Sequence, residues 1–416
     1  MAQLSDDCFA FGGPMLSVDA AIDLIIARAL PVGACERVSL MEADGRVLCE
    51  DLAARFPLPP FANSAVDGYA VRFSDLVPDQ LTSLPVLGRV EAGAGAQALE
   101  IGAAARVFTG APMPPGADTV FMQEDVTLEG DQVILPSGLK RGANMRPAGE
   151  DIEADQIALR KGARLRPQDV AFAAALGAHE LNVAQRLRVG VFSTGNELAA
   201  PGTERSGAQI YDSNRFMLLA MLRRLGCAPH DLGVLRDDTA HLAGALKAAA
   251  GEHDLLLTSG GVSTGEADYV KSALEQIGSL TFWRMAIKPG RPVAMGVIDG
   301  TPFVGLPGNP VASFVTFAYV VRPLALALMG ADVARFQPLP VRAAFSYKKK
   351  AGRREFVRVS LMPGADGVLE ARKFPREGAG LLSSLTQSDG LVELREDVTR
   401  VEPGQSVGFL GYAALD

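Results

Sequence analysis

The stretch from Thr258 to Asp268 combines the residue types best suited to chemistry in this chain. It reads TSGGVSTGEAD, follows the run Asp254–Leu257 and precedes a helix-like sequence. Glycines let the backbone approach a ligand closely, hydroxyls add donors, and a helix N-terminus offers free N–H groups to an anion. The residues expected to bind a phosphorylated ligand are Ser259, Gly260, Gly261, Ser263 and Gly265. An ordinary loop with capping residues is the plainer alternative, because Asp and Ser are good N-caps.

Three further loops follow predicted strands within residues 187–310. They are STGNEL, the triplet Arg236-Asp237-Asp238, and LPGNP. In a parallel sheet all four loops lie at one edge, so their acids Glu197, Asp237 and Asp268 would face one crevice. Clustered carboxylates repel one another unless a cation binds among them, and oxygen ligands without Cys or His favour Mg²⁺. Taken alone, Asp237 and Asp238 are better explained as caps of the next helix.

A positive charge is expected opposite these acids, at Lys288. Lys288 lies in AIKPGRP, between a hydrophobic pair and a Pro-Gly turn, which would hold its ammonium at a rigid corner. Two other segments, NSAVDGYAV and VFTGAPMPPGAD, could be turns or parts of a site. Asp67, in the first of them, is explained as well by hairpin-turn chemistry as by function.

Composition excludes several classes of protein. With 416 residues, 48% hydrophobic content and a net charge of −8, the chain is long enough for several domains and should not attract nucleic acid or anionic membranes. The four cysteines form no CxxC pair and the four histidines form no metal-binding motif, which is typical of a cytosolic protein rather than of a disulfide framework or zinc site. The N-terminus lacks the features of a signal peptide. We therefore expect a soluble cytoplasmic protein.

The pattern of predicted helices and strands changes along the chain. Ser17 is predicted to cap a helix, and residues 62–150 show the Gly, Pro and short alternating runs of a small β domain. From Leu187 strands and helices alternate, which predicts a mainly parallel sheet with helices on both faces. The apolar run Val311–Val321 stops at Arg322 and Pro323, is too short to span a bilayer and indicates a buried helix. After residue 331 short alternating runs return, as in a β barrel.

Taken in order, these segments resemble the motifs of the molybdopterin molybdenumtransferases, the family that includes the E domain of gephyrin. The shared motifs are NSAVDGYAV, FTGAPMPPGAD, RPAGEDI, STGNEL, IYDSNR, TSGGVSTGEADY, AIKPGRP and GLPGNPVASF. They run in order from about Ser17 to the C-terminus, so the resemblance covers nearly the whole chain. It implies an elongated homodimer that inserts molybdate into adenylylated molybdopterin, releasing AMP and the molybdenum cofactor, with Mg²⁺ or a similar cation.

The resemblance also assigns roles to individual residues. The catalytic set comprises Asp67, Thr109, Asp151, Glu197, Asp237, Asp268 and Lys288, of which Glu197, Asp237 and Asp268 would hold the cation. The substrate-binding set adds Pro307, Gly308, Pro310 and Arg358 to the hydroxyls and glycines of the glycine-rich loop. Lys288 and Arg358 are the candidates for binding molybdate, which as a tetrahedral dianion needs positive or N–H donors.

Four domains follow from the resemblance together with the changes in the predicted pattern. An elongated linking domain comprises residues 15–62 and 151–186, and a small β-rich domain comprises residues 63–150. A central, mainly parallel α/β domain at 187–330 would bind the pterin nucleotide, and a barrel-like β domain follows at 331–416.

Three positions depart from the family pattern. Asn196 stands where relatives often carry Asp, and Arg284 where a lysine is common. Ala379 stands where some relatives carry Ser, so a serine contact to molybdate would be lost here or would pass to Ser383 or Ser384.

Two other functions fit parts of the sequence. Molybdopterin adenylyltransferase has a fold that resembles residues 187–330, but it has no place for the flanking β domains and its loop typically reads TGGTG. A non-catalytic, gephyrin-like scaffold usually carries a fused second module, which we do not find. We therefore expect an enzyme whose partners are adenylylated molybdopterin, molybdate and a second copy of itself, with the adenylyltransferase as a further candidate partner.

Overall fold

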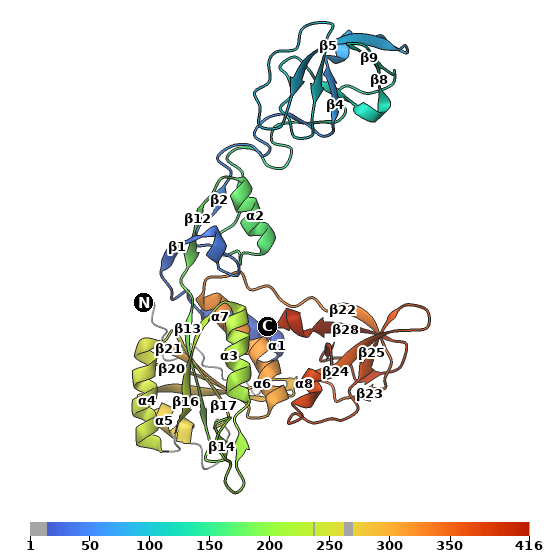
Figure 1. Ribbon diagram of the computed structural model, residues 1–416. Helices are drawn as coiled ribbons and strands as arrows, with labels where there is room; N and C mark the ends of the chain where they lie inside the picture. Colours follow the sequence, from blue (N-terminus) through green and yellow to red (C-terminus); the bar gives the residue numbers. More distant parts are fainter. Residues whose placement is uncertain (1–14, 236–237, 262–268, 416) are drawn as a thin grey trace. The chain divides into compact units, whose positions relative to one another are not determined.

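The computed structural model describes residues 15–235, 238–261 and 269–415 (Figure 1). Its contacts separate two compact units, each of which is described by itself. The first unit is the chain up to Cys49, Gly162–Leu165 and the chain from Leu181 onward; the second unit is Glu50–Lys161 and Arg166–Glu180. Both units are rich in sheet, as the sequence predicted. The four domain boundaries stay a prediction.

A six-stranded sheet forms the centre of the first unit, in the order β16-β13-β17-β21-β20-β18. The first four strands run parallel, whereas β20 and β18 run antiparallel to their neighbours. The strands are β13 (Arg188–Thr194), β16 (Ala228–Leu235), β17 (Leu255–Ser259), β18 (Gly278–Arg284), β20 (Pro292–Ile298) and β21 (Thr301–Leu306). Central parallel strands are covered on both faces, which explains near-continuous apolar runs such as LLLTS in β17.

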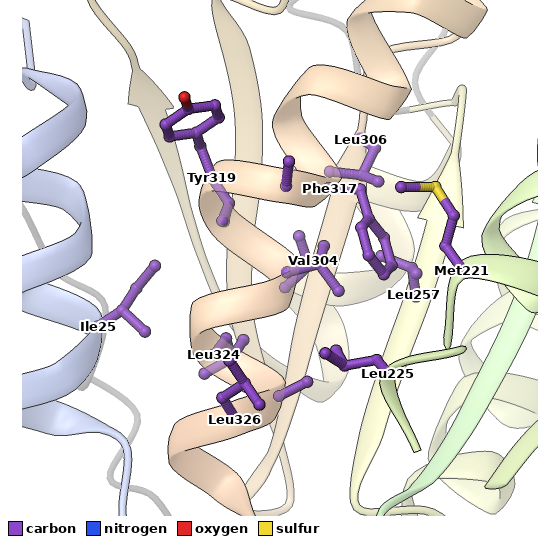
Figure 2. Close-up of a cluster of buried hydrophobic side chains, with 14 of the residues drawn as sticks. Ile25, Met221, Leu225, Leu257, Val304, Leu306, Phe317, Tyr319, Leu324 and Leu326 are labelled. Carbon is purple, nitrogen blue, oxygen red and sulfur yellow. The ribbon is translucent and has the colours of Figure 1, made fainter. Parts of the chain in front are cut away.

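Helices cover both faces of this sheet. Successive strand residues point to opposite faces, so Leu257 and Val304 join one core cluster while Leu256 and Phe303 join the other. Residues of α1, α3 and the helix that begins with α6 pack in the first cluster, and residues of α4 and α5 pack in the second (Figure 1). Figure 2 shows the first cluster, in which Phe317 lies beside Leu306 and Val304. The helices are α1 (Val18–Arg28), α3 (Asn214–Leu225), α4 (Thr239–Glu252) and α5 (Tyr269–Ile277).

The predicted buried helix is longer than the sequence indicated. α6 (Pro310–Thr316), a π-helical turn (Phe317–Val321) and α7 (Arg322–Leu328) form one 19-residue helix. It is apolar and long enough to cross a membrane, but 94% of its apolar window is buried inside the protein, as in a core helix. The helix therefore continues through Pro323, beyond the end of the apolar run. Proline lacks an N–H and clashes with the carbonyl four residues back, and the wider π turn just before Pro323 accommodates both effects.

The chain after residue 330 forms a closed β barrel. Its order is β24-β25-β22-β28-β26, and β26 pairs back with β24. β19 (Ile287–Lys288), which comes from the central part of the chain, pairs in parallel with β24 and ties the barrel to the central sheet. The barrel elements are β22 (Leu339–Ala343), β23 (Tyr347–Lys348), β24 (Arg354–Pro363), β25 (Leu369–Lys373), α8 (Ser383–Thr386), β26 (Gly390–Leu394), β27 (Arg400–Val401), β28 (Ser406–Gly411) and α9 (Tyr412–Leu415).

The second unit contains another six-stranded sheet, in the order β7-β4-β6-β5-β9-β8. The antiparallel pairing of β4 with β6 sets Gly68 opposite Val107, so the residues just before β4 and just after β6 lie at the same end. Those residues include Asp67 and Thr109. The elements of this unit are β2 (Leu52–Ala53), β3 (Asn63–Ser64), β4 (Gly68–Val71), β5 (Thr82–Val90), β6 (Ala104–Val107), β7 (Thr119–Met122), β8 (Thr127–Glu129), β9 (Gln132–Leu135), β10 (Met145–Arg146), β11 (Ile157–Leu159) and α2 (Pro167–Ala175).

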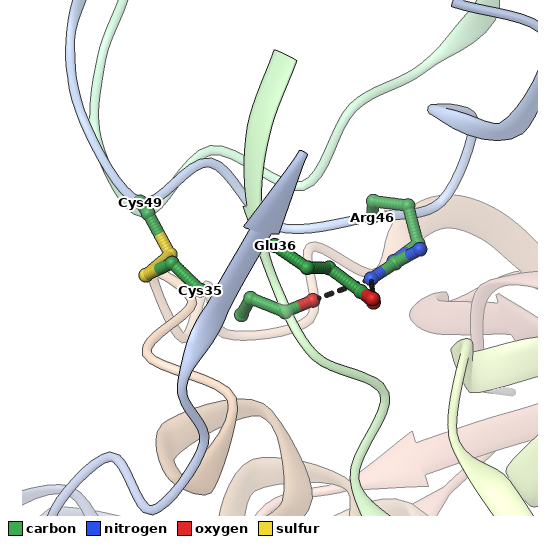
Figure 3. The surroundings of a disulfide bond; sticks show 5 residues. Cys35, Glu36, Arg46 and Cys49 are labelled. Carbon is green, nitrogen blue, oxygen red and sulfur yellow. Dashed lines mark hydrogen bonds and ion pairs between the residues drawn. A yellow bond between two sulfur atoms is a disulfide. The ribbon is translucent and has the colours of Figure 1, made fainter. Parts of the chain in front are cut away.

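Two of the four cysteines form a disulfide, Cys35–Cys49 (Figure 3). Cys35 begins β1 (Cys35–Ser39), and the N–H of Cys49 donates to Asn182 O in β12 (Glu180–Ala184), the strand that pairs with β1. This shared strand brings the two Cα atoms to 6.3 Å. The sequence predicted no disulfide, and this prediction is wrong for Cys35 and Cys49. The two cysteines are brought together by β12, a distant segment, so their spacing in the sequence does not reveal the bond.

Candidate active site

The four predicted loops begin at one edge of the central sheet. Strand register sets Thr194 opposite Leu235, Ser193 opposite Ser259, and Ser259 opposite Leu306. These are the C-terminal ends of β13, β16, β17 and β21, where ligands bind in open sheets of this kind. The loop that follows each strand therefore starts from the same edge.

The described part of the glycine-rich loop is fixed to its neighbours. Gly260 and Gly261 have φ values of 90° and 66°, which glycine adopts easily. The N–H of Gly260 donates to Leu306 O at 3.0 Å, and Ser259 Oγ donates to Pro307 O at 3.1 Å. A Cβ on Gly261 would lie 2.0 Å from the Oγ1 of Thr194, so packing alone requires glycine there. Ser263, Gly265 and Asp268 lie outside the described residues.

Asn214, part of the IYDSNR motif, joins two of these loops, a role that its sequence context did not predict. It begins α3, and its Nδ2 donates to Ser259 Oγ at 2.9 Å and to Gly308 O at 2.7 Å. Its buried Oδ1, like the buried hydroxyls of Ser193 and Thr258, has no hydrogen-bond partner in the part of the chain that the structure describes. Buried polar atoms without partners are uncommon and mark places where a water or a ligand completes the bonding.

Of the acids expected at this edge, the structure describes only Glu197 and Asp238. Glu197 is exposed and lies between β13 and β14 (Leu198–Ala199). Asp238 accepts from the N–H of His241 at 2.7 Å and caps α4, so the capping explanation holds for it. Asp237 lies outside the described residues, like Asp268. Within the described ranges no group of three or more His, Cys, Asp or Glu could hold a metal, and the predicted cation site stays a prediction.

A cavity of about 230 Å³ lies beside Lys288, lined by the end of β19 and by β23, β24 and the segment after β25 in the barrel. We call it the cationic pocket because Lys288, Arg358, Lys373 and Arg376 line it. The lining also includes one carboxylate, Glu377, which forms an ion pair with Lys373 at 2.7 Å. The balance of charge therefore favours an anion.

Lys288 and Arg358 keep binding capacity for such an anion. Burial lowers the pKa of Lys288, but its hydrogen bond to Glu355, together with Tyr347 and the Glu355 charge, outweighs this, so the pKa lies above its ordinary value. The Arg358 side chain is buried and donates to two backbone carbonyls, Gly378 O at 3.2 Å and Arg376 O at 3.4 Å. Burial lowers its pKa, and its Nε has no hydrogen-bond partner among the described residues. A guanidinium held by carbonyls rather than by carboxylates retains its charge for a ligand.

The cationic pocket adjoins the sheet edge. The N–H of Val311, one residue after the LPGNP turn, donates to Ala379 O in the pocket wall at 3.0 Å. On the other side, a Cβ on Gly290 would lie 2.5 Å from Thr316 Cγ2, so the turn after Lys288 packs tightly on α6. Asn309 occupies the N-cap position of α6 and Pro310 its first turn. The two sites therefore share the first turn of α6.

The departure at Ala379 removes a hydroxyl from the pocket wall. Ala379 contributes its carbonyl to the contact with Val311, as above. Neither Ser383 nor Ser384 is among the described residues that line the pocket, and Ser384 is buried with its hydroxyl donating to Leu381 O. Neither serine therefore contributes a hydroxyl to the described wall of this pocket.

The second unit contains a further pair of predicted catalytic residues. Asp67 Oδ1 accepts from both the N–H and the hydroxyl of Thr109, each at 2.8 Å. These two bonds, with a smaller contribution from Arg106, lower the pKa of Asp67. Arg106 stacks on Tyr69 and Phe108 beside them. The exposed Asp151 is in the same unit, and its N–H donates to Leu58 O.

Three family models match the chain in order. Residues 16–177 match the MoeA N-terminal region (domains I and II), residues 190–327 match a probable molybdopterin binding domain, and residues 340–411 match the MoeA C-terminal region (domain IV). The N-terminal and C-terminal matches distinguish this chain from a protein that consists of the central domain alone.

Named relatives match over nearly the whole chain. A molybdopterin molybdenumtransferase of Haemophilus influenzae is 39% identical over 396 residues, which are 94% of this chain and 98% of that protein. One of Synechococcus elongatus is 37% identical, covering 90% of this chain and 94% of that protein. The crystal structure of the molybdopterin biosynthesis moeA protein from Pyrococcus horikoshii OT3 has a TM-score of 0.79 and 31% identity, covering 95% of this chain and 99% of that chain. The chain belongs to the molybdopterin molybdenumtransferase family.

Proposed function

We propose that this protein inserts molybdate into adenylylated molybdopterin and releases AMP and the molybdenum cofactor. The observation that carries the proposal is the cationic pocket that adjoins the loop edge, joined by the Val311–Ala379 hydrogen bond. An anion pocket next to a phosphate-binding loop suits a reaction between a tetrahedral dianion and a phosphorylated nucleotide. The names of the relatives support the same reaction.

The loop edge would hold the pterin nucleotide. Gly260 and Gly308 present backbone without side chains, and the partnerless Asn214 Oδ1 is an acceptor for an N–H or O–H of the ligand. Ser263 and Gly265 belong to the same proposal because they continue the loop. Holding both reactants in adjoining sites converts a reaction in solution into one between bound groups, which is a large part of catalysis.

Molybdate would bind in the cationic pocket. Lys288 supplies an ammonium and Arg358 a guanidinium, and both act on the oxygen atoms of the dianion rather than on the metal. Because the pocket is partly enclosed, these charges interact with the anion more strongly than they would in water. The proposal assigns no role to a hydroxyl at position 379, where this chain carries Ala.

A divalent cation, with Mg²⁺ as the first choice, would be held by Glu197, Asp237 and Asp268. The exposed carboxylate of Glu197 fits a hard cation that prefers oxygen ligands. When bound, such a cation offsets the negative charge that develops as the phosphoanhydride bond breaks. Asp67, Thr109 and Asp151 are proposed to take part in the same reaction, on the strength of the family motifs that contain them.

Two measurements test this function. Calorimetric titration with molybdate should give binding to the unmodified protein and a loss of roughly tenfold or more in affinity for Lys288→Met or Arg358→Met, because a charge-assisted contact disappears. Lys350→Met, which removes an exposed lysine of the same barrel, is the matched control and should bind normally. The unmodified protein should also release AMP from adenylylated molybdopterin when molybdate is added. Absence of both binding and AMP release would exclude the proposed reaction.

The remaining partners are also proposals. The family resemblance supports a homodimer in the cytoplasm that receives its substrate from the adenylyltransferase and binds no nucleic acid or membrane. Light scattering at working concentration would test the dimer, and a monomer mass would contradict it. Glu197→Gln should raise the Mg²⁺ concentration needed for AMP release, whereas an unchanged requirement would remove Glu197 from the cation site.

A further inference from the structure

A buried carboxylate, Glu355, lies directly behind Lys288. The parallel pairing of β19 with β24 sets Lys288 opposite Glu355, so their side chains emerge on the same face. Lys288 Nζ is 3.1 Å from Glu355 Oε2. The Glu355 side chain is only 1% exposed, whereas that of Lys288 is 49% exposed, so the carboxylate lies beneath the ammonium rather than in the open pocket.

Tyr347 completes a three-residue cluster. Its hydroxyl donates to Glu355 Oε2 at 2.9 Å and accepts from Lys288 Nζ at 3.4 Å. The second oxygen of Glu355, Oε1, accepts from Arg353 at 3.2 Å. Burial and the hydrogen bond to Glu355 raise the pKa of Tyr347, which keeps its hydroxyl protonated as a donor.

This cluster determines how Lys288 can serve a ligand. An ammonium has three N–H donors, and Glu355 and Tyr347 accept two of them. One donor is then left for the side of the pocket. The lysine chain, which otherwise has four rotatable bonds, is held in one orientation by contacts that do not involve the ligand.

We propose that Glu355 is a positioning residue for molybdate binding: it keeps Lys288 charged and aimed into the cationic pocket. This inference rests on the proposed function. A carboxylate close to an anion site would ordinarily weaken binding. Here it is almost fully buried and lies between two cations, Lys288 and Arg353, so its effect is to hold the charge that the ligand meets. The plainer explanation is that Glu355 only links β23 to β24, and the two explanations predict different pH behaviour.

The test is molybdate titration of full-length Glu355→Gln across neutral and alkaline pH. Glutamine keeps the shape and an acceptor oxygen but removes the charge. We expect roughly tenfold weaker binding near neutral pH, as for loss of one charged hydrogen-bond partner. Because Glu355 raises the pKa of Lys288, the cation of the unmodified protein persists through the ordinary lysine range, and in the variant it is lost at a lower pH. The alkaline limb of the binding curve should therefore shift to lower pH.

The matched control is Glu370→Gln, which removes another barrel carboxylate paired with an arginine, Arg342, outside the pocket. It should change neither affinity nor the alkaline limb. Tyr347→Phe is the second variant, used also if Glu355→Gln does not fold, because it keeps the buried charge balance. It should weaken molybdate binding by a few-fold, since Lys288 loses one of its two acceptors.

The outcomes separate the inference from the proposed function. If the unmodified protein binds molybdate and Lys288→Met does not, the pocket assignment holds. If folded Glu355→Gln then shows unchanged affinity and an unchanged alkaline limb, the positioning role is overturned. If Glu355→Gln does not fold, an unchanged affinity in Tyr347→Phe overturns it instead. If the unmodified protein neither binds molybdate nor releases AMP when molybdate is added, the proposed function itself is wrong.

Discussion

Thr109 donates both its backbone N–H and its hydroxyl to a single oxygen of Asp67, Oδ1, at 2.8 Å in each case. These bonds fix the orientation of the carboxylate and leave its second oxygen outside the pair. A turn residue would normally bond its own following backbone. Asp67 instead accepts from a residue 42 positions away, which brings together two motifs that the sequence showed only separately.

The first prediction is that Asp67→Asn lowers cofactor formation by roughly tenfold or more while stability barely changes. Asparagine keeps an oxygen that accepts both bonds from Thr109, and it serves turns as well as Asp does. The substitution therefore removes charge at nearly constant shape. The measurement is turnover with saturating molybdate and pterin nucleotide, together with a thermal melt. Turnover equal to that of the unmodified protein would make Asp67 structural.

The second prediction concerns the acid limb of activity. Because the bonds from Thr109 lower the pKa of Asp67, the carboxylate stays ionised to a pH below its ordinary range. Its contribution to folding is therefore present above the unfolded-state pKa and lost as the pH falls through the lowered one. Thr109→Val keeps the backbone bond but removes the hydroxyl, so the pKa of Asp67 and the acid limb of kcat/KM should both move to higher pH. Thr109→Ser keeps the hydroxyl and should leave the acid limb of kcat/KM at its original pH. The prediction is contradicted if the acid limbs of Thr109→Val and Thr109→Ser lie at the same pH.

Sequence reasoning succeeded where a residue acts through its own neighbours. Ser17 caps α1 as predicted, its hydroxyl accepting from the N–H of Ala20, because capping depends on residues three positions apart. It failed where function depends on a partner that only the fold supplies. Glu355 carried no signal within the basic segment around it, since its role comes from the register of β24 with β19. Asn214 was noted as part of a motif, but its contact with Gly308 crosses 94 residues.

The third prediction uses Gly308, because Gly261 cannot give a clean test. Any side chain on Gly261 would collide with Thr194 and would disturb the loop even without a ligand. A Cβ on Gly308 would lie 3.6 Å from Gly260 Cα, an ordinary contact, so Gly308→Ala should fold normally. It should nevertheless weaken binding of the pterin nucleotide, by roughly tenfold, if the ligand approaches this backbone closely.

The measurement for Gly308→Ala is calorimetric titration with adenylylated molybdopterin, alongside a thermal melt. Gly244→Ala is the control, because its Cβ would point into open space on α4. The control should bind normally and be slightly more stable, since Ala favours helix over Gly by about 1 kcal/mol. Unchanged affinity in Gly308→Ala would mean that the ligand does not approach this turn.

The last prediction concerns Arg354, which is 4% exposed and ties the N-terminal helix to the barrel. It bonds to Asp19 in α1 at 2.6 Å and to Glu393 and Glu396 at 3.1 and 3.2 Å. Of these partners Glu393 is 9% exposed, whereas Asp19 and Glu396 are 38% and 27% exposed. Arg354→Met leaves the buried Glu393 without its paired cation, so it should lower the free energy of unfolding by about 3 kcal/mol, the lower end for a broken buried pair. Arg395→Met is the control, because Arg395 is 68% exposed and lies 3.9 Å from the same Asp19. Its loss should be less than about 1 kcal/mol.

The pH dependence of that loss distinguishes a lost charge partner from simple mispacking. Burial already raises the pKa of Glu393 while Arg354 is present, and without Arg354 the pKa should rise further. The folded variant then binds a proton that the unfolded chain releases, so its stability falls as the pH rises from the ordinary carboxyl range through the raised pKa. Adding Glu393→Gln to Arg354→Met should remove this slope and restore part of the stability, as measured by denaturant unfolding at several pH values. A loss that does not vary with pH, or that is equal in Arg354→Met and Arg395→Met, would contradict the assigned role of Arg354.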